Sequence, residues 1–269
     1  MATINNIESK NVKGTKSADN ITNGGSQVTI NALGDNDTII SSNDSDFNSF
    51  DFTSKVSING GAGNNLIQDR CDYSTFQGGD GNDNFDGFFP DSILDAGAGN
   101  DSINAFCCMT ITGGKGNDLI SLYSVRNLIK YKSGDGFDII YGFHSTDTLT
   151  ISGGSYSTTA SGKDIIVKVG KGKITLKNAK GNAININGKN VGGKSTNEKF
   201  ILLTSGDDKI VNNQDNVTIS GLGGSDTIEN AFGKNVSLNS GKGNDTIFNN
   251  SLWKCIIFIF NWQKVKTSN

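Results

Sequence analysis

The chain of 269 residues repeats one short glycine- and aspartate-rich motif about every 18 residues. The motif reads Gly, any residue, Gly, any residue, Asp, any residue, large apolar residue. Clear copies are GGDGNDNF from Gly78, AGAGNDSI from Ala96, GGKGNDLI from Gly113 and SGKGNDTI from Ser240. The acidic position recurs with spacings of 17 to 19 residues, at Asn65, Asp83, Asp101 and Asp118 and again at Asp208, Asp226 and Asp245. A fixed period of this length predicts a solenoid, because each repeat then forms one unit that stacks on its neighbours.

Apolar residues recur at half of that period and form two columns. One column contains Ile39, Ile67, Phe85, Ile103, Ile120, Ile140, Ile228 and Ile247. The other contains Ile30, Ile58, Phe76, Leu94, Ile111, Ile219 and Leu238. A coil with two short strands, each turning an apolar side chain inward, predicts an all-β parallel β-roll or β-helix with coils of about 18 residues.

The composition agrees with turns joined by short strands. There are 35 Gly and one Pro, and only three of the 27 acidic residues are Glu. Asp and Gly favour turns whereas Glu favours helices, so a helical bundle is excluded. A single Pro and the lack of a three-residue period exclude a collagen helix.

The stacked turns bring one Asp per coil close to the Asp of the next coil. Such a column of carboxylates is repulsive unless cations lie within it, and hard oxygen ligands suit Ca²⁺ better than Zn²⁺. The alternative is that the turns are rich in Gly and Asp for backbone geometry alone and bind no metal.

These motifs resemble the calcium-binding nonapeptide of the repeats-in-toxin (RTX) family. The stretch from Tyr131 to Gly154 also resembles the way in which such arrays close. The resemblance implies a β-roll that folds when it binds Ca²⁺ outside the cell, at an extracellular or cell-surface location. It also implies type I export without an N-terminal signal peptide, and the segment MATINNIESK has no apolar signal core.

Carried over position by position, the resemblance implies a set of metal ligands. The side-chain ligands would be Asp83, Asp101, Asp118, Asp138, Asp226 and Asp245. Backbone carbonyl ligands would come from Gly79, Gly81, Gly97, Gly99, Gly114, Gly116, Gly134, Gly136, Gly241 and Gly243. Each ion would be shared between successive motifs, on one side of the solenoid only. We expect Asn65, in place of Asp, and the loop residues Lys115 and Lys242 to weaken occupancy.

The sequence predicts four segments. Residues 1–150 form a first β-roll array, 151–194 a small β-rich module that closes it, and 195–250 the start of a second array. Equivalent positions in the two arrays, such as Ile21 and Ile210, lie 189 residues apart. Residues 251–269 form an atypical tail, which we interpret as the product of a frameshift near Ser251.

The sequence does not indicate an enzyme. His144 is the single histidine, so an H-E-x-x-H zinc site is impossible, and no G-x-S-x-G motif occurs. The four cysteines fit neither a disulfide framework nor a zinc motif and are interpreted as unpaired thiols. Scattered lysines disfavour nucleic acid as a partner, and no apolar run is long enough to span a membrane.

Three functions remain open, and one of them is a fragment whose partner domain is an enzyme encoded beyond its end. The first is calcium binding coupled to folding of a secreted or surface repeat protein. The alternative is a metal-independent solenoid that acts as an adhesin or surface spacer, with a host surface or neighbouring repeat chains as its partners.

Overall fold

The structure is a computed structural model that describes residues 2–6, 11–41, 55–69, 73–87, 91–106, 108–191, 199–214, 217–231, 236–249, 255–258 and 265–267. These residues form β-strands and turns and contain no helix. The described part of the chain therefore has no helix long and apolar enough to cross a membrane. The chain divides into two compact units, residues 1–47 with 51–194 and residues 48–50 with 195–269.

The first unit consists of two long sheets whose strands alternate along the chain. Sheet A follows the order β1 (Thr3–Asn6), β3 (Asn20–Asn23), β5 (Thr38–Ser41), β7 (Leu66–Asp69), β9 (Asn84–Phe85), β11 (Ser102–Ala105), β13 (Leu119–Leu122), β15 (Phe137–Tyr141), β19 (Gly172–Leu176), β18 (Asp164–Val169), β17 (Tyr156–Ser161). Sheet B follows the order β2 (Val12–Lys13), β4 (Thr29–Asn31), β6 (Ser57–Ala62), β8 (Thr75–Asp80), β10 (Ile93–Ala98), β12 (Thr110–Lys115), β14 (Leu128–Lys132), β16 (Thr148–Ser152), β20 (Asn185–Ile186), β21 (Lys189–Asn190).

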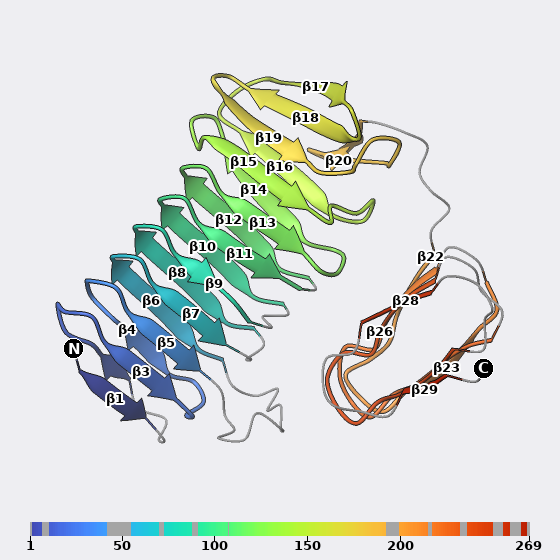
Figure 1. Cartoon of the computed structure of the whole chain (residues 1–269), viewed down its shortest axis with the longest axis horizontal. Helices are drawn as coiled ribbons and strands as arrows, with labels where there is room; N and C mark the ends of the chain where they lie inside the picture. The colour runs from blue at the N-terminus through green and yellow to red at the C-terminus, as the bar shows by residue number, and fades with distance from the viewer. Residues whose placement is uncertain are drawn as a thin grey trace. The chain divides into compact units, whose positions relative to one another are not determined.

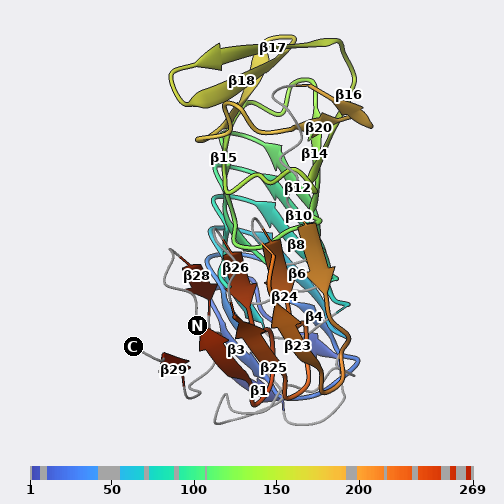
Figure 2. The same cartoon turned by 90° about the vertical axis from the view of Figure 1, so that its right-hand side faces the viewer.

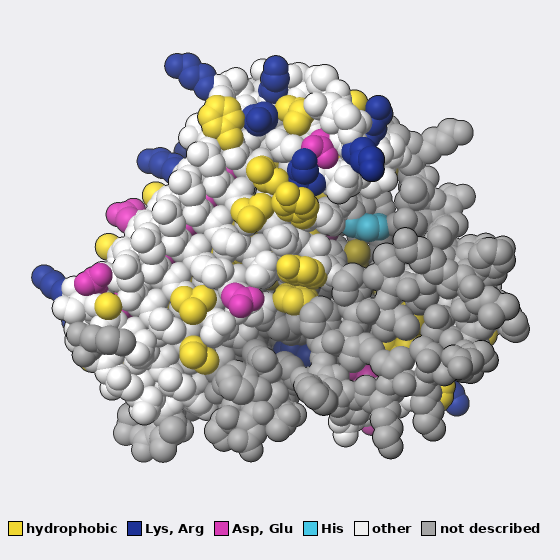
Figure 3. All heavy atoms as spheres, in the orientation of Figure 1, with side chains coloured by type: hydrophobic (Ala, Val, Ile, Leu, Met, Phe, Trp, Pro, Cys, Tyr) yellow, Lys and Arg dark blue, Asp and Glu magenta, His cyan; other side chains and the backbone are white. Residues whose placement is uncertain are grey.

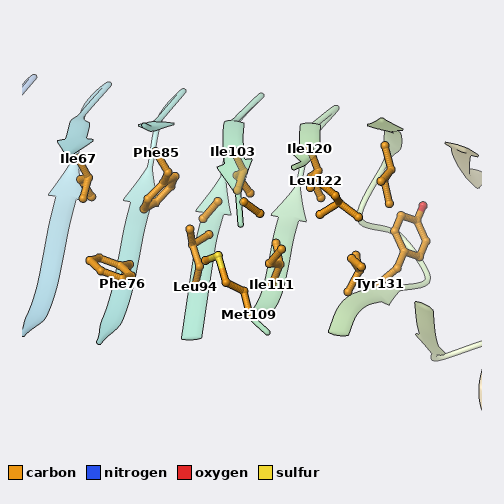
Figure 4. Packing of buried hydrophobic residues seen from close by; sticks show 14 of the residues in the cluster. Ile67, Phe76, Phe85, Leu94, Ile103, Met109, Ile111, Ile120, Leu122 and Tyr131 are labelled. Carbon is orange, nitrogen blue, oxygen red and sulfur yellow. The ribbon is translucent and has the colours of Figure 1, made fainter. Parts of the chain in front are cut away.

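As far as β19 in sheet A and β20 in sheet B, successive strands pair in parallel, and their register sets the coil length (Figure 1). Ile67 lies opposite Phe85, and Phe85 lies opposite Ile103, one motif period apart in both cases. The two predicted apolar columns face each other across the core, as Figure 4 shows for Phe85 and Ile103 on one side and Phe76 and Leu94 on the other. All four side chains are fully buried. The predicted parallel β-roll is therefore confirmed.

The parallel stack of the first unit ends in an antiparallel hairpin (Figure 2). β19 pairs in parallel with β15, but β18 then runs antiparallel to β19, and β17 antiparallel to β18. The inward residues Val167 and Ile174 pack against the core of the roll. This hairpin and the short β20–β21 pair occupy the position at which a further coil would otherwise stack.

The second unit contains two shorter parallel sheets. One follows the order β22 (Lys199–Leu202), β24 (Val217–Ser220), β26 (Val236–Asn239), β28 (Cys255–Phe258), and the other β23 (Lys209–Asn212), β25 (Thr227–Asn230), β27 (Thr246–Asn249), β29 (Val265–Thr267). Its own buried cluster includes Ile219, Ile228 and Leu238. The second array therefore repeats the architecture of the first roll.

The interpretation of the cysteines is wrong for Cys108, which is disulfide-bonded. Cys71 and Cys107 lie outside the described residues. Of the tail after Ser251, the structure describes the backbone of β28 and β29 only, so the frameshift interpretation stays a prediction.

Candidate metal centre

The Gly-rich motifs form stacked turns along one side of the solenoid, each joining a strand of sheet B to a strand of sheet A. In the first unit, β8, β10 and β12 run into the paired glycines, and Gly79, Gly97 and Gly114 lie in register with one another. These glycines have positive φ angles, between 97° and 110°, a conformation that is strained for other residues. The repeated glycines are therefore a backbone requirement of the turn.

The motif aspartates form a buried ladder that links each coil to the coil before it. The Oδ1 atom of Asp101 accepts a hydrogen bond from the backbone N–H of Asp83 at 2.7 Å. Asp118 and Asp138 accept in the same way from Asp101 and Asp118, at 2.9 and 3.1 Å. In the second unit, Asp245 accepts from the N–H of Asp226 at 2.9 Å. The structure thus brings the predicted aspartates of each unit into one column.

The second carboxylate oxygen of most ladder residues is buried without a partner. This holds for the Oδ2 atoms of Asp83, Asp101, Asp118 and Asp226. Burial raises the pKa of Asp83 and Asp118 to about 6 and that of Asp101 to about 7. The side chain of Asp118 adds repulsion to Asp101. A buried carboxylate oxygen with no hydrogen-bond donor lowers the stability of the folded protein. The described groups of the chain therefore do not satisfy all the acceptors of the ladder.

These raised pKa values predict that the calcium-free protein becomes less stable as pH rises. Between about pH 4 and about pH 7 the folded ladder binds more protons than the unfolded chain, whose carboxyl pKa values lie near 3.8. The contribution of these carboxyls to the free energy of unfolding is therefore largest at the acid end of this range. It is lost as the pH rises through their pKa values in the folded protein. Urea unfolding in chelator across this range measures the slope, and stability that rises with pH would contradict the burial of these carboxyls.

The glycine carbonyl groups line the gap between successive turns. A Cβ added to Gly97 would overlap the carbonyl oxygen of Gly79, and one added to Gly99 would overlap that of Gly81. The backbone N–H groups of the next turn donate to other acceptors than these glycine carbonyls. The N–H of Gly99 donates to Lys115 O, and the N–H of Asn100 donates to Asn82 Oδ1. The gap is thus narrow and contains oxygen atoms.

Both observations fit a hard divalent cation. Each gap offers carboxylate oxygens that lack donors and carbonyl oxygens from glycines, the oxygen donor set that Ca²⁺ prefers over soft metals. Among the described residues no three Asp, Glu, His or Cys side chains form a ready metal cluster. An ion in this ladder would therefore need backbone carbonyl ligands in addition to carboxylates.

The last motif of the first unit differs from the others. A Cβ on Gly134 would meet no atom within 4 Å, so this glycine is not stacked on an earlier turn. The carbonyl of Gly136 accepts hydrogen bonds from Tyr131 Oη at 2.7 Å and from the N–H of Lys173 at 2.9 Å. The structure therefore leaves Gly134 outside the repeating arrangement, whereas Gly136 stacks on Gly116 and its carbonyl already has two donors. The carboxylate of Asp138 forms the last rung.

The second unit places its predicted glycines as the first does. Gly241 and Gly243 have φ angles of 81° and 120°, and a Cβ on either would overlap the turn before it. Its loop lysine, Lys242, is buried, whereas Lys115 in the first unit is exposed. An exposed ammonium group is well screened, so the expected repulsion from Lys115 is weak.

A second ladder, which was not predicted, lies beside the aspartates. In the first unit, Asn residues that precede the motif Asp or its Asn65 equivalent accept a hydrogen bond from the following coil, as Asn64 does from Asn82 N–H at 2.6 Å and Asn82 from Asn100 N–H at 2.6 Å. The Asn-Asp pair that recurs in the motifs is the sequence feature from which this second ladder could have been predicted. Asp37 also belongs to the aspartate ladder, with an unpartnered buried Oδ2 and a pKa raised by burial to about 6.

The opposite turns carry mainly neutral side chains at the equivalent rungs. Ser74 and Ser92 accept backbone N–H bonds there at 3.1 and 3.0 Å, and Asn127 does so at 3.0 Å. The exception is Asp147, whose two oxygens accept from Asn127 N–H and His144 N–H at 2.8 and 2.7 Å. Carboxylate oxygens without donors therefore concentrate on the motif side.

Comparison with known proteins matches the chain to the RTX calcium-binding nonapeptide repeat in four copies, at residues 91–105, 110–123, 132–156 and 204–236. Asp83 and Asp245 lie outside these ranges, although the structure places them in the same ladders. No curated protein matches the sequence significantly.

Among solved structures, the chain is similar to the extracellular lipase LipA from Serratia marcescens, with 16% identity and a TM-score of 0.32. The similarity covers 62% of this chain and 38% of the lipase, so the chain spans well under half of that protein. The four repeat matches, on stacked turns with the same Gly and Asp pattern, show that the chain contains RTX calcium-binding nonapeptide repeats.

Proposed function

We propose that this protein binds Ca²⁺ between successive Gly/Asp turns and that binding is coupled to folding of the rolls. The observation that carries the proposal is the row of buried Oδ2 atoms without donors at Asp83, Asp101 and Asp118. In each gap a cation would neutralise two neighbouring carboxylates, and Gly79, Gly81, Gly97 and Gly99 would offer carbonyl oxygens. The role of Ca²⁺ when bound is to supply the positive charge that the chain lacks there.

The setting we propose is extracellular or at the cell surface, after type I export. Sites with few carboxylates per ion resemble extracellular calcium modules, whose dissociation constants are about 10⁻⁴–10⁻³ M. Folding would then occur where calcium is abundant. We assign the chain no catalytic role, and its partners besides Ca²⁺ would be a host surface or neighbouring repeat chains.

A metal-independent solenoid is the second candidate, and one observation favours it. The Oδ1 atoms and the Asn side chains already satisfy backbone N–H groups between coils, for example Asn65 N–H to Asp83 at 2.7 Å. The continuous apolar core of the first unit adds stability that needs no ion. Such a protein would act as a spacer or adhesin.

Far-UV circular dichroism of the full chain separates the two candidates. We expect weak β signal in chelator, a large gain on adding millimolar Ca²⁺, and little change with Mg²⁺ at the same concentration, since Mg²⁺ gives up its water reluctantly. A spectrum that is fully β in chelator and unchanged by Ca²⁺ would replace calcium-coupled folding by the structural solenoid.

A further inference from the structure

The outer face of sheet A changes character where the first roll meets its closing hairpin. The register gives three cross-strand rows there. In the first, Phe137 lies beside Lys173, and Lys173 lies opposite Lys168. In the second, Leu119 lies opposite Ile139, and Ile139 opposite Thr175. In the third, the pairing of Ile140 with Leu176 continues to Tyr141 and Lys177, and the N–H of Lys177 donates to Ile140 O at 2.9 Å. We call Leu119, Phe137, Ile139, Tyr141, Lys168, Lys173 and Lys177 the cap face.

Four large apolar side chains of the cap face are exposed to solvent. The exposed fractions are 41% for Leu119, 53% for Phe137, 38% for Ile139 and 43% for Tyr141. In earlier coils the position of Leu119 is taken by Ser102 on β11, Asn84 on β9 and the partly buried Leu66 on β7. Single exposed apolar residues occur elsewhere in the structure, but the cap face gathers four of them on adjacent strands, and such clustering is typical of an interaction surface.

The lysines of the cap face are poorly neutralised. Lys168 and Lys173 lie directly opposite each other on antiparallel strands, an arrangement that is unfavourable for like charges. Lys177 forms an ion pair with Asp164 at 2.6 Å, while Lys173 Nζ lies 5.7 Å from the centre of the Phe137 ring. Figure 3 shows dark blue lysines beside yellow apolar side chains, with little magenta, on this upper part of the molecule. The cap face is therefore both cationic and apolar.

We propose that the cap face docks onto an anionic phospholipid surface. Lysines at such a surface meet the phosphate and carboxylate groups of the lipids, and aromatic and aliphatic side chains enter the headgroup layer beside them. An acidic peptide would use the lysines but leave the four apolar side chains in water. A second copy of the chain, docked through the same face, would set three lysines against three with one Asp on each side, which is repulsive.

Vesicle cosedimentation of the full chain tests this, with Ca²⁺ held constant throughout. We expect the protein to sediment with phosphatidylcholine vesicles that contain phosphatidylserine, to remain in solution with phosphatidylcholine alone, and to be released as salt is raised. The double variant Lys168→Glu, Lys173→Glu should lower partitioning by more than about 25-fold, because each lysine near an anionic membrane contributes about fivefold and each new glutamate is repelled in addition. The double variant Phe137→Ser, Tyr141→Ser should weaken binding at all salt concentrations.

The matched control is Lys55→Glu with Lys130→Glu, which makes the same charge change at exposed lysines on other strands and loops. Equal loss in this control would overturn the proposal in favour of a general charge effect. Unchanged binding in both cap-face variants would assign the lipid contact, through bridging Ca²⁺, to the aspartate ladder instead. Binding to polyglutamate that depends on Lys168 and Lys173, without binding to vesicles, would replace the lipid by an acidic protein partner.

Circular dichroism in Ca²⁺ separates failure of this proposal from failure of the proposed function. Each variant should show the spectrum and calcium response of the parent protein, because these seven side chains point away from the core and the ladder. A variant with an altered response is replaced by the milder Lys→Gln or Tyr141→Thr form before binding is compared.

Discussion

Replacing Asp101 by Asn is expected to stabilise the calcium-free protein and to weaken its response to calcium. The Asn side chain keeps an Oδ1 that can accept the N–H of Asp83, so the ladder bond at 2.7 Å is retained. It removes the buried Oδ2 that has no donor. Removing an unsatisfied buried group of this kind contributes about 1–3 kcal/mol.

The chain already contains one such rung. Asn65 accepts the N–H of Asp37 at 2.9 Å through Oδ1, and its Nδ2 donates to the carbonyl of Gly63 at 3.3 Å. The amide therefore satisfies a turn carbonyl that elsewhere is available to an ion. An Asn at position 101 should act in the same way and should lower calcium affinity about tenfold at the gaps on either side, because fewer charged ligands remain.

Urea unfolding in chelator and calcium titration measure the two effects of Asp101→Asn. The stability gain should be present near neutral pH and should vanish in acid, because the carboxyl of Asp101, with its pKa of about 7, is then protonated in the parent protein. Asp86→Asn makes the same charge change at an exposed side chain just after β9 and serves as the control. Lower stability of Asp101→Asn in chelator, with an undiminished calcium response, would contradict the ladder as the site.

Replacing Gly97 by Ala should destabilise the first roll far more than replacing Gly134 by Ala. The two glycines occupy the same motif position, and their φ angles are 108° and 105°. Both substitutions carry the cost of a positive φ, about 1–3 kcal/mol. The Cβ at position 97 would also overlap the backbone carbonyl of Gly79, whereas the Cβ at position 134 would meet no atom within 4 Å. We expect an additional loss of about 1–3 kcal/mol for Gly97→Ala alone.

The comparison of these two glycines is made by urea unfolding at saturating Ca²⁺. Because backbone conformation is matched, the difference between the two variants isolates the contact between coils. Equal destabilisation would show that the turns are not stacked as closely as the structure has them. A larger loss for Gly134→Ala would mean that the last turn carries more of the stability than its open surroundings indicate.

The core of both rolls could be predicted from the sequence because its signal is periodic. Phe85 and Leu94 are nine residues apart and face each other from different sheets, and a residue of the same kind recurs in every coil. Side-chain direction in a strand alternates strictly, so the apolar columns determine which face turns inward. The buried aspartates follow from the same register, one per turn.

The direction of the polar ladders could not be predicted. Whether Asp101 accepts from the coil before it or Asn82 from the coil after it depends on how two turns fit together, and the two residue types have similar turn preferences. The different surroundings of Gly134 also depend on contacts between coils, since its motif matches the others and only the step of 20 residues from Asp118 to Asp138 differs. Composition and spacing carry no information on which carbonyl accepts the hydrogen bond of the Tyr131 hydroxyl.

The antiparallel hairpin β17–β18–β19 limits how a chain of this kind can grow. A parallel solenoid exposes a strand edge at its end, and an open edge can recruit a strand from another molecule. Here the reversal of direction after β19 ends the parallel template, so no further coil of the same hand can be added to it. A longer protein built from such units would lengthen as a series of separately terminated blocks. Each block could then fold, unfold or be duplicated in evolution without disturbing the register of the next.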